Sequence, residues 1–335
     1  MSLPLALLTH ALPGDWLASL KGHVRAVVGP LDATYLAPEL EAYLVEAEGL
    51  FCLLTIPVRK ELLDRMPRLR VVSNMAVGVD NVDVAECTAR GIPVGNTPGV
   101  LTDATADLTM ALLLAAARRL PQAAQDAHAG RWKTWSPAGW LGADFRGATL
   151  GIVGLGKIGR AVAERARGFG LRIVYTDTTS RQDVEAELGA TFLSFDELIR
   201  QSDFISLHCP LISETRGLIN ESALRKMKPT AILVNAARGP VVDTVALVRA
   251  LSEGWIAAAA LDVTDPEPLP SDHPLYSLPN CLIVPHIGSA TRGTRRRMAE
   301  MACENLLAGL EGRRLPYCVN PEVYEKPVFS KKTGF

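Results

Sequence analysis

The sequence has no excess of charge of either sign and no long hydrophobic run. Its 335 residues carry 35 basic and 36 acidic side chains, a formal net charge of −1. Such a balance gives no electrostatic footprint for nucleic acid or an anionic membrane. The longest apolar runs, such as residues 110–117, are too short to span a bilayer. Residues 1–10 lack the basic leader and long apolar core of a secretory signal. We therefore expect a cytoplasmic protein with neither a nucleic-acid nor a membrane partner.

Cysteines are few and scattered. No two of them form a Cys-x-x-Cys pair, and no two histidines have the spacing of metal ligands. We therefore expect no metal site, and we expect the cysteines to act as small buried apolar residues rather than as disulfides. The six are Cys52, Cys87, Cys209, Cys281, Cys303 and Cys318.

Aromatic residues make up only 6% of the chain, yet three of the five tryptophans fall within residues 132–140. Exposed aromatic clusters often mark interfaces. Alternatively, these rings pack over the neighbouring helix expected at 101–119, whose middle is apolar on nearly every face. Of the two interpretations, the sequence favours packing over that helix.

What the sequence does have is a regular alternation of short apolar runs and helical segments. A chain of this length is typical of about two domains, and the alternation predicts α/β architecture with parallel sheets. We expect a smaller domain over residues 1–101, completed by 290–335, and a dinucleotide-binding domain over 102–289. The smaller domain has expected strands at 5–9, 50–56 and 70–75, and expected helices at 14–21, 38–48 and 60–66. A long helix over 291–311 and a basic tail with Lys326, Lys331 and Lys332 close the chain.

The central motif is a Gly-x-Gly-x-x-Gly turn that follows an apolar strand at 149–153 and opens a helix. Gly154 permits a tight turn, Gly156 lets the backbone approach a pyrophosphate, and Gly159 lets helix and strand pack closely. The positive end of the helix favours a phosphate there. Asp177 ends the next strand, 18 residues beyond Gly159, where a carboxylate accepts hydrogen bonds from the adenosine ribose. The alternative is an ordinary turn with a solvated aspartate.

The strand–helix rhythm continues after this motif, and strands in this order build a doubly wound parallel sheet. The expected strands lie at 191–193, 203–207, 231–235, 256–261 and 281–284, and the expected helices at 196–200, 221–227 and 243–253.

A loop at 76–83 follows the expected strand at 70–75 and contains Val77 and Gly78. Ligands of open α/β sheets gather beyond the carboxyl ends of the strands. A glycine there exposes backbone N–H groups that could hold a carboxylate. The alternative is a simple strand-to-helix turn in which Asp83 caps the helix, and the loop alone does not decide between the two.

Three residues able to do chemistry follow strands of the second domain: Arg238, Glu267 and His286. The carboxyl ends of those strands converge at one rim, where the glycine turn also opens. Arginine suits a two-point grip on a carboxylate, histidine exchanges a proton near neutral pH, and a neighbouring carboxylate fixes the tautomer of the ring. With a nicotinamide cofactor, this set suits reduction of a 2-keto acid.

Each of the three also has a plain structural interpretation when taken alone. His286 follows a proline and could be a hydrogen-bonded structural residue, Arg238 could be a surface charge, and Glu267 is one of three acids in its loop. Their convergence argues for function. His208 also ends a strand, but it is better placed to line a cofactor cleft than to react.

Several motifs together resemble the D-isomer-specific 2-hydroxyacid dehydrogenases over essentially the whole chain. Among these enzymes the sequence is most similar to the glyoxylate/hydroxypyruvate reductases, through residues 99–103, 265–270 and 286–291. The motifs that carry the family resemblance are residues 77–83, 154–159, 235–239, 262–268 and 285–290.

The resemblance implies a doubly wound, Rossmann-type cofactor domain and a smaller flavodoxin-like α/β substrate domain. It implies a catalytic triad of Arg238, Glu267 and His286, with the substrate carboxylate bound by Val77, Gly78, Arg238 and Ser289. It also implies a homodimer paired through the dinucleotide-binding domains, with a tryptophan matching Trp140 reaching the partner's active site. The implied cofactor contacts are Thr105, Gly154, Gly156, Lys157, Ile158, Asp177, His208, Cys209, Pro210, Ala236, Ala237, Arg238, Asp262 and His286.

Departures from the resemblance bear on cofactor and substrate. Many glyoxylate/hydroxypyruvate reductases favour NADPH and lack an acid at the position of Asp177. Because a carboxylate there repels a 2′-phosphate, we expect NAD(H) to be preferred, with NADP(H) possible if Arg181 and the hydroxyls of 178–180 soften the repulsion. Val77 stands where phosphite dehydrogenases have a lysine, which argues against phosphite as the substrate. Glu267 stands where formate dehydrogenases have a glutamine, which argues against formate.

The sequence therefore predicts reduction of glyoxylate or hydroxypyruvate to the (R)-2-hydroxy acid, with hydride from the nicotinamide and a proton from His286. The alternatives are phosphite oxidation, which Arg295 would favour, or reduction of another 2-keto acid. A non-enzymatic alternative is a dinucleotide-sensing protein similar to the corepressors that resemble this family.

Overall fold

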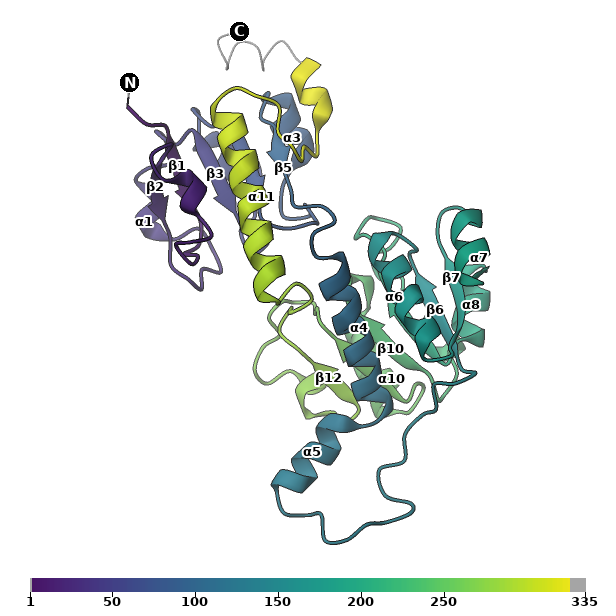
Figure 1. Ribbon diagram of the computed structural model, residues 1–335. Helices are drawn as coiled ribbons and strands as arrows, with labels where there is room; N and C mark the ends of the chain where they lie inside the picture. The colour runs from purple at the N-terminus through teal and green to yellow at the C-terminus, as the bar shows by residue number, and fades with distance from the viewer. Residues whose placement is uncertain (1, 326–335) are drawn as a thin grey trace. The chain divides into compact units, whose positions relative to one another are not determined.

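The computed structural model describes residues 2–325, so the basic tail lies outside the described residues. The chain forms two compact units, each built on its own parallel sheet (Figure 1). It leaves the first unit between Leu101 and Thr102 and returns to it between Ala290 and Thr291.

The first unit contains a five-stranded parallel sheet in the order β2-β1-β3-β4-β5. This 2-1-3-4-5 order is that of flavodoxin-like folds, as the family resemblance implied. The strands are β1 (Leu5–Leu8), β2 (Arg25–Val28), β3 (Gly49–Cys52), β4 (Val71–Asn74) and β5 (Val94–Gly95). The helices are α1 (Pro38–Glu41), α2 (Lys60–Asp64), α3 (Val84–Ala89) and α11 (Arg292–Leu310), with 3-10 turns η1 (Ala18–Leu20) and η4 (Pro321–Glu325).

Local structure in this unit departs from the sequence-based expectation at four places. The helices expected at 14–21 and 38–48 shrink to η1 and α1, and β2 and β5 were not predicted. β2 is an edge strand with mostly exposed side chains, and β5 has only two residues, so neither shows the apolar pattern of a buried strand.

Helix α11 joins the first unit although it follows the second in sequence. Its buried Met298, Ala302 and Leu306 share a hydrophobic cluster with Phe51 of β3 and Val71 of β4. The backbones approach so closely that a Cβ on Gly309 would lie 2.5 Å from Val71 Cβ. The return of the chain therefore completes the core of the first unit.

The second unit contains a seven-stranded parallel sheet in the order β12-β11-β10-β9-β6-β7-β8. Alternate residues of β10, such as Leu233 and Val234, belong to two different hydrophobic clusters, so both faces of the sheet are covered. This is the doubly wound, Rossmann-type sheet that the sequence predicted. The strands are β6 (Thr149–Val153), β7 (Arg172–Thr176), β8 (Thr191–Phe192), β9 (Phe204–Leu207), β10 (Ile232–Asn235), β11 (Ala258–Leu261) and β12 (Cys281–Ile283).

Helix α4 runs along one face of this sheet, against α6, β10 and β11 (Figure 1). Its Leu112 and Leu113 are buried there, as its apolar pattern predicted. The helices are α4 (Thr102–Ala117), α5 (Leu120–His128), α6 (Lys157–Gly168), α7 (Gln182–Leu188), α8 (Phe195–Gln201), α9 (Glu221–Lys226) and α10 (Thr244–Ser252), with 3-10 turns η2 (Gly239–Val241) and η3 (Pro274–Ser277). Of these, α5 and α7 were not predicted.

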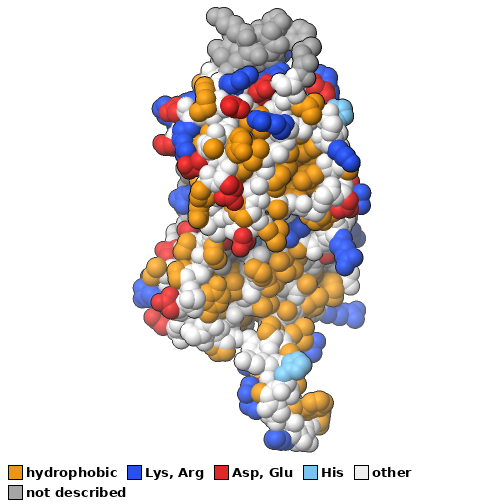
Figure 2. Space-filling view, turned by 90° about the vertical axis from the view of Figure 1, so that its left-hand side faces the viewer, with side chains coloured by type: hydrophobic (Ala, Val, Ile, Leu, Met, Phe, Trp, Pro, Cys, Tyr) orange, Lys and Arg blue, Asp and Glu red, His pale blue; other side chains and the backbone are white. Residues whose placement is uncertain are grey.

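The tryptophan-rich segment does not pack over α4, so that expectation was wrong. Trp132 and Trp135 are 74% and 79% exposed. Together with α5, residues 129–141 form an arm that projects from the second unit (Figure 1), and both hydrophobic and basic side chains are exposed near its end (Figure 2). At the base of the arm, the Arg119 guanidinium lies 5.1 Å from the centre of the Trp140 ring, and Gln122 of α5 donates a hydrogen bond to Pro279 O.

A buried asparagine ties the C-terminal segment into the first unit. Asn320 is 1% exposed, and its Oδ1 accepts a hydrogen bond from Val94 N at 2.8 Å. Its Nδ2 donates to Thr88 Oγ1 at 2.8 Å and to Ile92 O at 3.1 Å. The amide thus satisfies one backbone donor and one backbone acceptor that water does not reach.

Substituting Asn320→Ala leaves these groups unsatisfied, so we expect it to lower the free energy of unfolding by about 1–3 kcal/mol. Urea unfolding of the variant and the wild-type protein measures this loss. Gln201→Ala, at an exposed position at the end of α8, is the control and should leave the midpoint unchanged. A wild-type midpoint for Asn320→Ala would contradict the role assigned to this amide.

Candidate active site

The strands of the second unit end side by side. Pairing places Val153 beside both Thr176 and Leu207, and the row continues from Leu207 through Asn235 to Leu261 and Ile283. The residues that follow these positions therefore emerge along one edge of the sheet. That edge carries every predicted site residue of this unit except Thr105, which lies on α4.

The glycine turn has the steric constraints that its sequence suggested. Gly154 has φ +92°, and a Cβ there would lie 2.7 Å from Cys209 N. A Cβ on Gly159 would lie 2.2 Å from Gly154 O, so the first turn of α6 can approach the strand only without a side chain. Gly156 faces open space, where a Cβ would meet no atom within 4 Å. Lys157 after it is exposed, and Ile158 is partly buried.

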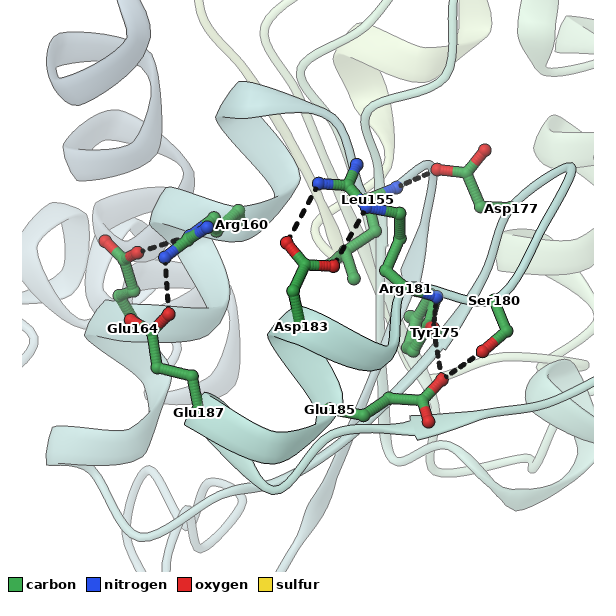
Figure 3. A network of polar contacts seen from close by, with 10 residues as sticks. All are labelled: Leu155, Arg160, Glu164, Tyr175, Asp177, Ser180, Arg181, Asp183, Glu185 and Glu187. Carbon is green, nitrogen blue, oxygen red and sulfur yellow. Dashed lines mark hydrogen bonds and ion pairs between the residues drawn. The ribbon is translucent and has the colours of Figure 1, made fainter.

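Asp177 lies beside this turn and is fixed by it (Figure 3). Its Oδ2 accepts a hydrogen bond from Leu155 N at 2.8 Å, and its Oδ1 accepts one from Thr178 N at 2.7 Å. The carboxylate is thus held between the end of β7 and the glycine turn. Oδ1 also accepts a hydrogen bond from Thr178 Oγ1 at 3.3 Å, so Oδ2 is the oxygen that retains a lone pair for a further donor.

The loop after Asp177 is held by a second polar network (Figure 3). The Tyr175 hydroxyl donates to Glu185 Oε1 at 2.6 Å and accepts from Arg181 N at 2.6 Å. Ser180 Oγ donates to the same Glu185 oxygen at 2.7 Å. The Arg181 guanidinium reaches Asp183, with both contacts at 3.4 Å. The cation and one of the hydroxyls nearest Asp177 are therefore already engaged within the loop.

His208 and Cys209 follow β9 and pack against Gly154. His208 Nε2 lies 2.7 Å from Ser206 Oγ, and its Nδ1 is buried without a partner in the described part of the chain. Burial lowers the pKa of His208 to about 4, and burial raises the pKa of the Cys209 thiol to about 11. Both side chains are neutral near pH 7, while Pro210 beside them is exposed.

The turn carrying Arg238 is shaped by Asn235, the last residue of β10. Asn235 Nδ2 donates to Arg238 O at 2.9 Å, and its Oδ1 accepts from Ala237 N at 3.0 Å. The next residue, Gly239, packs directly on the loop after β11, since a Cβ there would lie 1.9 Å from Thr264 O. These contacts bring the Arg238 turn against the loop that carries Glu267.

Glu267 and His286 form a direct pair. His286 Nδ1 lies 2.5 Å from Glu267 Oε1, and the two side chains are 27% and 33% exposed. Because a carboxylate accepts, Nδ1 carries the proton in this contact and Nε2 is the other ring nitrogen. His286 also has a left-handed backbone, with φ 49°, which for a residue with a side chain costs of order 1–3 kcal/mol.

Asp262 holds the turn on which His286 lies. Its Oδ1 accepts from Ile287 N at 2.6 Å, its Oδ2 from Gly288 N at 2.9 Å, and its carbonyl from His286 N at 2.9 Å. Burial raises the pKa of Asp262. Thr105 of α4 donates to Gly288 O at 3.2 Å. Both residues, expected as cofactor contacts, therefore stabilise the histidine turn, a role that sequence reasoning missed.

The loop of the first unit contains both a helix cap and a run of backbone N–H groups without an acceptor among the described residues. Asp83 caps α3, because its Oδ1 accepts from Glu86 N at 2.9 Å, which confirms the capping interpretation. Three consecutive backbone N–H groups, those of Val77, Gly78 and Val79, donate to no acceptor within residues 2–325. Binding of a carboxylate by these donors stays a prediction.

Three predicted residues on the turns after β10 and β12 are at least partly buried. Ala236 and Ser289 are partly buried, and Ala237 is buried. None of the six cysteines, all within the described range, forms a disulfide. In residues 2–325, no group of three or more His, Cys, Asp or Glu side chains could hold a metal ion, and no helix is long and apolar enough to cross a membrane.

Comparisons with known proteins show the family to which the chain belongs. Residues 110–288 match the family model for the NAD-binding domain of D-isomer specific 2-hydroxyacid dehydrogenases. The chain is 48% identical over 321 residues to the glyoxylate reductase of Korarchaeum cryptofilum, covering 96% of this chain and 97% of that protein.

Two solved structures are similar over nearly their whole length. A Thermus thermophilus protein is 49% identical with a TM-score of 0.88, covering 94% of this chain and 99% of that one. The NADPH-dependent glyoxylate/hydroxypyruvate reductase of Sinorhizobium meliloti, solved with NADP and malonate, is 33% identical with a TM-score of 0.81, covering 95% and 97%. The chain belongs to the D-isomer specific 2-hydroxyacid dehydrogenase family.

Proposed function

We propose that the protein reduces glyoxylate or hydroxypyruvate to the (R)-2-hydroxy acid, with NADH as the preferred cofactor. The observation that carries this proposal is the His286–Glu267 pair at the edge of a sheet whose glycine turn suits a dinucleotide. The glyoxylate reductases among the relatives support the choice of substrate class.

In this proposal His286 supplies the proton. Glu267 holds Nδ1, so Nε2 is the nitrogen that donates to the keto oxygen, and Glu267 stabilises the positive charge of the ring before transfer. Arg238, on the adjoining turn, balances the charge that develops on that oxygen and grips the substrate. The nicotinamide, when bound, supplies the hydride.

The residues present fit a dinucleotide. A phosphate can approach the first turn of α6 over Gly156, where no side chain intervenes. We propose the cofactor contacts expected from the sequence: Thr105, Gly154, Gly156, Lys157, Ile158, Asp177, His208, Cys209, Pro210, Ala236, Ala237, Arg238, Asp262 and His286. Of these, His208 and Cys209 would contribute neutral surface rather than charge.

Preference for NADH rests on Asp177 and its surroundings. Family membership does not decide the cofactor, since the Sinorhizobium relative is NADPH-dependent. Here the Asp177 carboxylate is fixed beside the glycine turn, where it accepts ribose hydroxyls and repels a 2′-phosphate. Two of the groups that could offset the repulsion are engaged elsewhere, because Arg181 faces Asp183 and Ser180 donates to Glu185.

For the substrate carboxylate we propose the backbone N–H groups of Val77 and Gly78, with Arg238 and Ser289. Oriented main-chain N–H groups form a small anion-binding site without a charged side chain. The same loop carries Val77 where phosphite dehydrogenases have a lysine, which favours a 2-keto acid over phosphite.

The projecting arm supports a homodimer. Trp132, Trp135 and Leu141 are more than two-thirds exposed on one segment, and apolar surface of this kind is typical of protein interfaces. We propose that a second copy of the chain covers it, pairing the dinucleotide-binding units. The cytoplasmic location expected from the sequence stays a prediction.

Turnover of a substrate panel tests the proposed activity. We expect NADH oxidation with glyoxylate and hydroxypyruvate, and lower kcat/KM with pyruvate and phenylpyruvate. His286→Ala should lower kcat by roughly a hundred- to ten-thousand-fold while NADH still binds, because proton transfer contributes that much.

His23→Ala, at an exposed position of the first unit, is the matched control and should keep wild-type turnover. Turnover of NAD with phosphite, but of no 2-keto acid, would replace the proposed substrate. No turnover with any of them would favour the dinucleotide-sensing alternative. Near-normal kcat in His286→Ala would remove this residue as the acid.

Cofactor preference is tested by Asp177→Asn, which keeps an oxygen for Leu155 N but removes the charge. We expect the NADPH-to-NADH ratio of kcat/KM to rise by at least about tenfold, because that corresponds to losing only about 1.4 kcal/mol of repulsion. Glu187→Gln, on α7 beside Arg160, removes a charge outside the ribose loop and should leave the ratio unchanged (Figure 3). A wild-type enzyme that prefers NADPH would refute the role given to Asp177.

The oligomeric state is tested by light scattering after size exclusion. We expect the wild-type protein to have the mass of two chains and the double variant Trp132→Glu/Trp135→Glu to have the mass of one, because buried glutamates would disfavour the interface. Tyr276→Glu, an exposed aromatic outside the arm, should remain dimeric. A monomeric wild-type protein at micromolar concentration would contradict this interface.

A further inference from the structure

A pair of buried asparagines lies beneath the loop that carries Val77 and Gly78. Asn74 is the last residue of β4 and is fully buried, and Asn81 is 8% exposed. Asn74 Nδ2 donates to Asn81 Oδ1 at 3.0 Å, and Asn81 Nδ2 lies 3.3 Å from Asn74 Oδ1. The two amides therefore bind each other reciprocally across the base of the loop.

Each amide of this pair also reaches the backbone. Asn74 Nδ2 donates to Gly78 O at 3.0 Å. Asn81 Nδ2 donates to Leu53 O at 3.2 Å and to Ile56 O at 3.1 Å, in the loop after β3. The pair thus joins the ends of two neighbouring strands and fixes the path of the chain at Gly78.

The carbonyl groups of residues 76–80 are all held by donors of the first unit. Because a trans peptide is planar, a carbonyl held in one direction turns the N–H of the following residue in the opposite direction. The carbonyls of residues 76–78 are held in this way. The N–H groups of Val77, Gly78 and Val79 therefore point away from the donors that hold those carbonyls. The holding contacts are Thr97 N to Ala76 O at 2.9 Å, Asn96 Nδ2 to Val77 O at 2.8 Å, Asn74 Nδ2 to Gly78 O at 3.0 Å, Val82 N to Val79 O at 2.8 Å and Arg59 Nη2 to Asp80 O at 2.6 Å.

We propose that Asn74 and Asn81 are positioning residues that fix these N–H groups for the carboxylate of the substrate. This inference rests on the proposed function, in which Val77 and Gly78 bind that carboxylate. The pair lies wholly within the first unit, whereas the proposed cofactor contacts all lie in the second. It therefore sets the affinity for the 2-keto acid without setting the affinity for NADH.

The chain offers a matched control for the destabilisation that any buried asparagine substitution causes. Asn320 is equally buried in the same unit and also bridges backbone groups, but it holds β5 and α3 rather than the 76–80 loop. Loss of a buried amide at either place leaves backbone groups unsatisfied. Only loss of the Asn74–Asn81 pair should alter the donors of the loop.

The test compares Asn74→Ala, Asn81→Ala and Asn320→Ala as full-length enzymes. We measure kcat and KM for glyoxylate, the inhibition constant of oxamate as a carboxylate probe, and the dissociation constant of NADH. For Asn74→Ala and Asn81→Ala we expect KM and the oxamate constant to rise together by at least about tenfold, as misplaced binding groups cost this much or more. NADH affinity should stay within about twofold of wild type, since its proposed contacts lie in the other unit. Asn320→Ala should melt earlier yet keep the wild-type KM.

Several outcomes would overturn the proposal. Wild-type KM and oxamate constants in folded Asn81→Ala would do so, as would an equal rise in Asn320→Ala, which would show a merely structural effect. If Asn81→Ala does not fold, Asn81→Ser keeps a hydroxyl donor in a smaller side chain and should give an intermediate KM; a wild-type KM there would count against the pair. If the wild-type enzyme neither reduces a 2-keto acid nor binds oxamate, the proposed function fails first and this inference fails with it.

Discussion

The parallel alignment of strand ends is the constraint on which the second unit depends. Strand pairing fixes five residues in one row: Val153, Leu207, Asn235, Leu261 and Ile283. Residues that are far apart in sequence therefore lie at one edge of the sheet, and no contact between their side chains is needed to place them there. The chemistry is then decided by the few residues beyond that row. The turns that carry Gly154, Arg238 and His286 are all short, so the rigid sheet limits how far each turn can move.

Buried polar side chains at the strand ends convert this coarse placement into a fixed geometry. Asn235 holds the Arg238 turn, Asp262 holds the turn after His286, and Asn74 holds the 76–80 loop of the other sheet. Each is buried, so each must find partners for its polar atoms, and in each case the partners include backbone groups of a loop that carries candidate site residues. Satisfying the buried group and fixing the loop are therefore the same event.

Much of the fold could be predicted because long-range pattern determines it. Alternating apolar runs and helices specify parallel sheets, and the glycine spacing identifies β6 as the strand that leads into the dinucleotide-binding turn. Edge strand β2 and helix α5 were not predicted because neither buries enough side chains to require a periodic pattern of apolar residues. The tryptophans of residues 132–140 led to the wrong prediction for the opposite reason. Hydrophobic content alone does not tell whether a ring packs against its own chain or stays exposed.

Of the candidate site, the chemical groups could be predicted but their supports could not. Arg238, Glu267 and His286 stand out because their residue types complement one another at strand ends, and the structure pairs two of them directly. Nothing in the sequence distinguishes Asp262 as a ligand contact from Asp262 as the anchor of a turn, because both require a carboxylate after β11. Only the hydrogen bonds to Ile287 and Gly288 separate the two roles.

In the proposed function, main-chain donors would let a chain with a net charge of −1 bind anionic ligands. In the 76–80 loop, the N–H groups of Val77, Gly78 and Val79 are turned away from the protein donors because the carbonyls beside them are used within the fold. Such donors have no protonation state to lose, and they cannot be moved without refolding the loop. Their position is therefore set by whatever holds the carbonyls, and a change remote from any ligand atom, such as one at a buried asparagine, acts on the ligand through the peptide plane.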